Sequence, residues 1–438
     1  MSDHAPFSEE NGVPQNDLLE RVLERSNLNA AWKRVRANKG APGIDGMSVE
    51  DFPAFAREHM SRLKDQIREG RYAPAAVRRV WIPKPNGEER PLGIPTVLDR
   101  VIQQALAQIL GPIFDADFSE QSYGFRTGRR AHDAIEHISK VSQNGYKWGV
   151  ECDLKSFFDI VNHDLLMYRI GLKVRDKRLL RLVGKYLRAG VKLEDGTIEK
   201  TPKGVPQGGP LSPLLANIML DPLDAMIEAM GLPFVRYADD FLVMAPTKAE
   251  ALAALVELRR FVESELKLLI NEDKTRVASL GKCEFLGFVV RGKQIRISDK
   301  ARKRFRVRIR EETSRRRGIS MEARLKGLKT YSVGWFNYFK IGLLYKDARA
   351  WDGWIRRRVR LCYWKMWKLP RKRRRMLIKL GVDPSAVKMA SRSRKGYWRL
   401  SSNPLVQYAL SDDWLEAQNV PSLAKLWIVF KYGDKANV

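Results

Sequence analysis

Apolar residues recur at helical spacing in the first quarter of the chain, where they predict three helices: Leu18–Asn38, Phe52–Gly70 and Leu98–Leu110. In the third helix, for example, Val101, Ala105 and Leu106 share one face. The first two helices are separated by Lys39–Gly46, which is rich in Gly and Pro and predicts a loop. The N-terminal part is therefore expected to be mainly helical.

Strand-like segments follow at wider intervals. Arg78–Pro95 predicts two short strands around a Pro85-Asn86-Gly87 turn. Further strands are expected within Gly149–Leu154, Val235–Ala245 and Glu284–Val290, with a helix over Lys248–Leu268. Strands that alternate with helices indicate an α+β or α/β catalytic body over about residues 60–290. After residue 291 the pattern is helical, and we expect Lys368–Arg375 to connect two helices.

Two adjacent acids, Asp239 and Asp240, stand in an otherwise apolar strand-forming segment. Asp is depleted in strands, so a tight hairpin turn is the simplest explanation. Two acids at one turn still repel each other unless a cation lies between them. Asp153 ends a second apolar segment, and three converging carboxylates would suit two Mg²⁺ ions, which prefer oxygen ligands. From the residues alone, a passive turn and a metal site both stay open.

Basic residues are concentrated in one segment of the chain. Arg291–Leu400 holds 36 basic and 7 acidic residues, a surplus of 29 that equals the net charge of the whole protein. The other residues balance at 44 of each sign. A surplus of this size, interleaved with aromatic residues, indicates a surface that binds nucleic acid. An anionic membrane surface is the main alternative.

Several classes of protein do not match the composition. No run approaches 18 apolar residues, which argues against a membrane span. The polar N-terminus lacks the apolar core of a secretory signal. The cysteines, Cys152, Cys283 and Cys362, are scattered and predict neither disulfides nor a zinc site. We therefore expect a cytoplasmic protein, and the family resemblance described below implies a bacterial one associated with the nucleoid.

Five segments in order resemble the motifs of reverse transcriptases. They are CDLKSFFD with Asp153, GVPQGGPLSPLLANIMLDPLD from Gly204, FVRYADDFLV with Asp239, NEDKT from Asn271 and CEFLGF from Cys283. AWKRVRANKGAPGIDG and YGFRTGRRAHDAI, earlier in the chain, are similar to segments of group II intron-encoded reverse transcriptase/maturases. The resemblance implies an α+β right-hand polymerase fold, with fingers and palm, followed by an α-helical basic thumb/maturase domain.

The resemblance also implies roles for individual residues. Asp153, Asp239 and Asp240 would be the catalytic ligands of two Mg²⁺ ions, with the Leu154 carbonyl as a further ligand. The nucleotide-binding residues would be Lys84, Arg90, Phe158, Gln207 and Lys274. Phe158 would exclude a 2′-hydroxyl by a steric clash, although a core aromatic is the plainer interpretation. Exposed turn charges are likewise the plainer interpretation of Lys84 and Arg90.

The same resemblance divides the chain into four parts. They are an N-terminal extension (1–62), fingers and palm (63–290), a thumb/maturase domain (291–385) and a C-terminal segment (386–438) that would bind DNA. RNA-binding residues are expected at Arg302, Arg304, Arg308, Arg371, Arg373 and Arg374. Family members with endonuclease activity append a His- and Cys-bearing module, and its absence predicts no endonuclease.

The leading hypothesis is an RNA-directed DNA polymerase that copies intron RNA and binds that RNA to promote splicing and retrohoming. Its partners would be group II intron RNA, a template–primer duplex, target DNA and dNTPs, with no membrane. One alternative is a maturase whose polymerase is dispensable, and another is a related reverse transcriptase domesticated for defence or repair. Monomer and homodimer both stay open.

Overall fold

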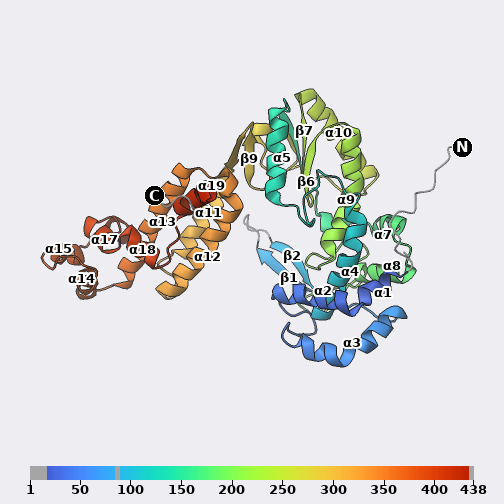
Figure 1. Cartoon of the computed structure of the whole chain (residues 1–438), viewed down its shortest axis with the longest axis horizontal. Helices are drawn as coiled ribbons and strands as arrows, with labels where there is room; N and C mark the ends of the chain where they lie inside the picture. The colour runs from blue at the N-terminus through green and yellow to red at the C-terminus, as the bar shows by residue number, and fades with distance from the viewer. Residues whose placement is uncertain (1–16, 84–88, 434–438) are drawn as a thin grey trace. The chain divides into compact units, whose positions relative to one another are not determined.

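The chain forms two compact units, Met1–Cys283 and Glu284–Val438, and the computed structural model describes residues 17–83 and 89–433 of them (Figure 1). The first unit combines two sheets with helices, whereas the second is mainly helical. The four-part division expected above, with boundaries after residues 62, 290 and 385, stays a prediction.

The central sheet of the first unit contains four antiparallel strands in the order β6-β7-β3-β8. Their bounds are β3 Trp148–Cys152, β6 Phe234–Tyr237, β7 Asp240–Ala245 and β8 Arg276–Ser279. Val150, Phe241 and Val243 are buried, and such β-branched and aromatic side chains favour strands. Helix α10 (Lys248–Ser264) packs on β3, β7 and β8, and α5 (Ala131–Gln143) packs on β6. These helices bury the apolar residues of the sheet.

The second sheet has the strand order β2-β1-β4-β5. Its strands are β1 Val77–Pro83, β2 Glu89–Ile94, β4 Val191–Lys192 and β5 Ile198–Glu199. The antiparallel pairing of β1 with β2 confirms the two strands predicted within Arg78–Pro95. The predicted Pro85-Asn86-Gly87 turn between them lies outside the described residues.

The other helices of the first unit are α1 Leu18–Leu23, α2 Arg25–Ala37, α3 Phe52–Arg68, α4 Val97–Asp115, α6 Phe157–Ile160, α7 His163–Lys173, α8 Lys177–Leu187, α9 Ser212–Ala229 and a 3₁₀ turn, Leu280–Lys282. The predicted second and third helices are confirmed as α3 and α4. The predicted helix Leu18–Asn38 is instead two helices, because Glu24 has an extended ψ of 140°. The apolar spacing breaks there: the buried Leu23 is followed by Leu28, five residues later.

The second unit begins with a two-stranded sheet, β9 Phe288–Arg291 and β10 Gln294–Ile297. Its helices are α11 Asp299–Glu312, α12 Met321–Phe339, α13 Tyr345–Met366, α14 Pro370–Lys379, α15 Val387–Arg392, α16 Tyr397–Leu400, α17 Pro404–Ala409, α18 Asp412–Ala417, α19 Leu423–Tyr432 and a 3₁₀ turn, Lys340–Gly342. An aromatic cluster forms its core, in which the Phe305 ring lies 4.2 Å from Trp335 and 4.8 Å from Trp351 between centroids.

Two local predictions in the second half of the chain are wrong. The strand expected from Glu284 begins only at Phe288, because Leu286 and Gly287 adopt left-handed φ values of 50° and 80° and turn the chain. The connection expected over Lys368–Arg375 is mostly helix α14. Pro370 starts this helix, where a proline is well tolerated.

The predicted α+β fold, with a helical basic part after the catalytic body, is confirmed. None of the helices within the described ranges combines the length and the apolar character needed to cross a bilayer.

Candidate active site

The acidic pair lies at the tip of the β6–β7 hairpin. Tyr237 pairs with Asp240, which leaves Ala238 and Asp239 as a two-residue turn. Ala238 has a φ of 61°, a left-handed conformation that disfavours a side chain by about 1–2 kcal/mol. Gly124 approaches this turn so closely that a Cβ there would lie 2.3 Å from the Ala238 nitrogen. The turn is thus held in a strained conformation by its neighbours.

The third aspartate follows strand β3, the neighbour of β7. Cys152 on β3 pairs with Phe241 on β7 in antiparallel register. The next residue along β3 is Asp153 and the preceding residue on β7 is Asp240, so the register directs these two acids to the same place. The structure therefore brings the three predicted carboxylates to one edge of the sheet.

The segment between helix α10 and strand β8 holds Asp153 in place. Its Oδ2 accepts hydrogen bonds from Asn271 Nδ2 at 2.9 Å and from Lys274 Nζ at 2.8 Å. The backbone N–H of Asn271 donates to the Asp153 carbonyl at 2.8 Å. The carboxylate raises the pKa of the exposed Lys274 ammonium, chiefly through this hydrogen bond. One predicted nucleotide-binding residue, Lys274, therefore contacts a predicted metal ligand.

The three carboxylates influence one another electrostatically. Loss of solvation raises the pKa of Asp240 to about 6, and repulsion from Asp239 and Asp153 adds to this shift. Burial also raises the pKa of Asp239, with a further contribution from Asp153, whereas Arg90 and Lys274 act in the opposite direction. The Asp240 side chain is also partly exposed to solvent, so water screens part of this repulsion.

The donor chemistry of this site fits hard divalent cations. Three carboxylates that repel one another lose that repulsion when a cation lies between them. Within the described ranges, however, no group of three or more His, Cys, Asp or Glu side chains is arranged as a ready ligand set. A metal ion would compete with Lys274 for the Asp153 oxygen. The Leu154 side chain is a buried hydrocarbon without donor atoms, so its backbone carbonyl is the candidate ligand.

Two predicted nucleotide-binding residues meet beside this edge. Arg90 Nε donates to Gln207 Oε1 at 2.7 Å, and the N–H of Gly93 donates to the Gln207 carbonyl at 2.7 Å. These bonds join strand β2 to the Pro-Gln-Gly segment. Lys84, predicted to act with Arg90, lies outside the described residues.

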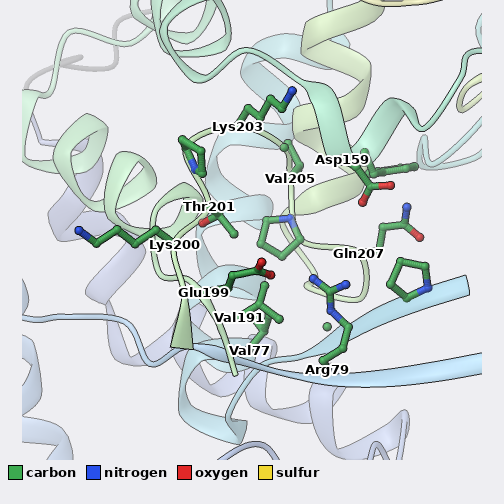
Figure 2. Close-up of a pocket in the computed structure, with 16 residues that line it drawn as sticks. Val77, Arg79, Asp159, Val191, Glu199, Lys200, Thr201, Lys203, Val205 and Gln207 are labelled. Carbon is green, nitrogen blue, oxygen red and sulfur yellow. The ribbon is translucent and has the colours of Figure 1, made fainter. Parts of the chain in front are cut away.

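Phe158 lies in the wall of a cavity of about 380 Å³. Arg79, Asp159 and Gln207 also line this cavity (Figure 2). The Phe158 ring packs edge-on against Phe157 with 5.0 Å between centroids, and both side chains are buried. A core role is therefore established for Phe157, whereas Phe158 both packs and borders open space beside Gln207.

The predicted RNA-binding residues of helix α11 differ in how they are used. Arg304 is exposed. Arg308 is also exposed, but it forms an ion pair with Glu312 at 2.7 Å. Arg302 is largely occupied within the unit, where it donates to Asp347 at 2.8 Å.

The predicted residues of helix α14 divide in the same way. Arg371 and Arg374 are exposed and line a basic hollow together with Lys372 and Arg375. Arg373 is buried, with its guanidinium 4.9 Å from the centre of the Trp364 ring. We therefore exclude Arg373 from the exposed basic surface, because its side chain is committed to packing.

Two residues that contact the site do not stand out in the predictions above. Asn271 donates a hydrogen bond to Asp153. It belongs to the NEDKT segment, in which only Lys274 was assigned a role. Arg236 is fully buried immediately before the acidic hairpin. A charged residue inside an apolar strand, Phe234-Val235-Arg236-Tyr237, is the signal that could have identified it.

Two family models match most of the described chain. Residues 82–290 match "Reverse transcriptase (RNA-dependent DNA polymerase)". Residues 302–380 match "Group II intron, maturase-specific domain". The first match spans all three carboxylates, and the second spans helices α12, α13 and α14 and most of α11.

The chain is also similar to individual known proteins. Protein YkfC of Escherichia coli (strain K12) is 34% identical over 318 residues, which cover 64% of this chain and 82% of that protein. Group II intron-encoded protein LtrA of Lactococcus lactis subsp. cremoris is 31% identical over 356 residues, which cover 65% of this chain and 59% of that protein. A solved "Partial Cas6-RT-Cas1--Cas2 complex" is 26% identical, with a TM-score of 0.37, over 60% of this chain and 46% of its own.

The raised pKa of Asp240 predicts how pH affects stability when no divalent metal is present. A carboxyl that binds its proton more tightly in the folded state contributes stability at low pH, and this contribution is lost as the pH rises towards 6. Asp240→Asn should therefore raise the melting temperature at pH 7.5 and leave it nearly unchanged at pH 4. Thermal melts in EDTA measure this. Equal melting temperatures for both proteins across the range would contradict it, and added Mg²⁺ should remove the advantage of the variant.

Proposed function

Because the chain belongs to the family of reverse transcriptases that carry a group II intron maturase-specific domain, we propose that Asp153, Asp239 and Asp240 are the catalytic residues with which it copies RNA into DNA. The observation that carries this proposal is the convergence of the three carboxylates at the ends of adjacent strands, where repulsion from Asp239 and Asp153 adds to the raised pKa of Asp240. Such mutual repulsion is unfavourable in a purely structural site and is useful in one that binds cations.

Reverse transcriptases use divalent metal ions, and we infer that this chain uses two Mg²⁺ ions held by the three aspartates and the Leu154 carbonyl. When bound, the ions would lower the pKa of the primer 3′-hydroxyl and stabilise the leaving pyrophosphate. The residues of this chain orient those ligands. Asn271 and Lys274 both donate hydrogen bonds to Asp153 Oδ2 and so orient this carboxylate. A bound cation would replace Lys274 at that oxygen.

The incoming dNTP is proposed to bind between Gln207, Arg90 and Phe158. Arg90 acts electrostatically on Asp239, so a triphosphate beside it would lie near the acidic edge. Phe158 borders the cavity next to Gln207, where a flat ring can exclude a 2′-hydroxyl. Lys274 would contact phosphate after leaving Asp153. Lys84 is proposed on its sequence position alone.

The second unit is proposed to bind group II intron RNA through exposed basic side chains of α11 and α14: Arg304, Arg308, Arg371 and Arg374. Structured RNA is recognised mainly through phosphates, 2′-hydroxyls and shape, which matches a surplus of 29 positive charges over residues 291–400. Promotion of splicing and retrohoming into target DNA would follow from this binding. Arg302, which pairs with Asp347, would orient α11 instead of contacting RNA.

Asp239→Asn should abolish cDNA synthesis. It removes one negative charge from the metal site without changing side-chain size, and the loss of several kcal/mol of charge stabilisation lowers kcat by about 1,000-fold. Primer extension on an RNA template with dNTPs and Mg²⁺ measures this. Glu272→Gln is the matched control, since Glu272 is exposed and pairs with Arg259. Extension by Asp239→Asn at the wild-type rate, or no extension by the wild type, would contradict the polymerase proposal. Either result would favour a maturase in which the polymerase part serves only as a scaffold.

Phe158→Ala should admit ribonucleotides. Without the ring, the steric exclusion of a 2′-hydroxyl disappears, and the preference for dNTPs over rNTPs, as a ratio of kcat/KM values, should fall about tenfold or more. Single-nucleotide incorporation with matched dNTP and rNTP measures this ratio. Phe157→Leu is the control, because Phe157 packs in the core beside Phe158. A general loss of activity with an unchanged ratio would show that Phe158 only packs.

Arg371→Gln and Arg374→Gln should weaken RNA binding and its dependence on salt. Each lost phosphate contact reduces the slope of log K against log salt by about 1. Filter binding to structured intron RNA at several KCl concentrations measures the slopes, and splicing at low Mg²⁺ should fall in parallel. The control is Arg260→Gln, an exposed arginine paired with Glu257 on α10. Equal slopes for all three variants would contradict the proposed surface.

A further inference from the structure

Arg236 places a fully buried positive charge within the hairpin that carries Asp239 and Asp240. It lies on β6, two residues before the left-handed Ala238, and its side chain is 0% exposed. A buried charge is strongly unfavourable unless partners satisfy it. The partners of this guanidinium therefore indicate why an apolar strand keeps an arginine.

Helix α9 supplies two of the partners. Arg236 Nε donates to Asp224 Oδ1 at 2.7 Å, and a second nitrogen donates to Asp224 Oδ2, so the pair is bidentate. A third nitrogen donates to Asn217 Oδ1 at 2.9 Å. Asn217 and Asp224 are seven residues apart, which puts them on one face of the helix. Both are buried, so the rigid fork of Arg236 is fixed from the α9 side.

The remaining contact of the network reaches the turn itself. The nitrogen that bonds Asn217 also donates to the Ala238 carbonyl at 3.1 Å. Asn217 acts on the other side of the turn as well, because its Nδ2 donates to the Gly124 carbonyl at 2.9 Å. Gly124 is the residue that packs against the Ala238 nitrogen. The backbone around Ala238 is therefore held on both sides by one polar network.

We propose that Arg236, anchored by Asp224 and Asn217, is a positioning residue that holds the Ala238 carbonyl and thereby sets where the Asp239 carboxylate projects. The Ala238 carbonyl belongs to the peptide group that leads into Asp239, so fixing this oxygen fixes the plane from which the Asp239 side chain departs. An ion pair needed only to join α9 to β6 would require Asp224 alone. The bond to Ala238 extends the same rigid group into the active site.

Two variants distinguish a positioning role of Arg236 from a role in packing alone. Arg236→Lys keeps the charge and can keep Asp224, but a single ammonium lacks the planar fork that reaches Asn217 and Ala238 together. The double variant Arg236→Met/Asp224→Leu removes both charges, and apolar replacement of a buried ion pair often preserves stability. It also removes the donor to Ala238. Arg324→Lys is the control, since Arg324 is a buried arginine that donates to backbone carbonyls, including that of Ser314, in the second unit.

The expected result is a loss of turnover and of metal affinity without a matching loss of stability. For both Arg236 variants, kcat in primer extension should fall about 10- to 100-fold while KM for dNTP changes little. The dissociation constant for Mn²⁺, measured by EPR without substrate, should rise about tenfold or more. The melting temperature of the double variant should stay close to that of the wild type, and Arg324→Lys should change neither kcat nor Mn²⁺ affinity.

This inference rests on the proposed polymerase site, but its failure can be distinguished from failure of that proposal. If the wild type extends primers and a folded Arg236 variant keeps its kcat and Mn²⁺ affinity, the positioning role is overturned. The same holds if losses across all variants simply follow melting temperature. If the wild type fails to extend primers, the polymerase proposal fails. The Mn²⁺ measurement on Arg236→Lys then still tests the positioning role: weaker binding than in the wild type supports it, and unchanged binding overturns it.

Discussion

Asp153, Asp239 and Asp240 repel one another and would move apart if they were free. The pairing of the strands that carry them keeps the three carboxylates close together. The antiparallel pairing of β3 with β7 directs Asp153 and Asp240 to one place, and a shift of one residue would turn every side chain to the other face. The buried Val150 opposes such a shift, since one step along β3 would bring the charged Glu151 to its place. Apolar packing thus sets the electrostatics of the site. Lys274 and Arg90 offset only part of the repulsion.

The local pattern of the chain was enough to predict β1, β2, β3 and the segment that forms the β6–β7 hairpin, because alternation and turn residues act over a few positions, but it did not predict β8. The pairing of Asp153 with Asp240 depends instead on register between strands about 90 residues apart, which a pattern of neighbouring residues does not reveal. The ordered motifs supplied that information through resemblance. Neither source indicated that Asn271 bonds to Asp153 or that Arg236 reaches Ala238, because both contacts depend on side-chain directions in the folded chain.

One of the errors in the second half shows how tertiary packing decides local structure. Lys368–Arg375 was expected to connect two helices, and a run of like charges is unfavourable within a helix. The structure forms helix α14 there, since Arg373 and Leu377 are spaced four apart and are both buried. Arg373 lies over Trp364, so one charge of the run is stabilised by an aromatic face instead of by solvent. Tertiary packing therefore overrides a preference that is local and weak.

Burial also separates two roles of the basic surplus. A guanidinium packed on an aromatic ring keeps its charge, so Arg373 still contributes to the long-range field that attracts a polyanion. It has no surface from which to bond a phosphate, whereas Arg371 and Arg374 do. For the proposed RNA-binding role, the surplus of 29 would therefore affect how fast RNA is attracted, and the exposed subset would determine how many phosphates are held. Because the salt dependence of equilibrium binding reports phosphates neutralised, it should reflect far fewer than 29 contacts.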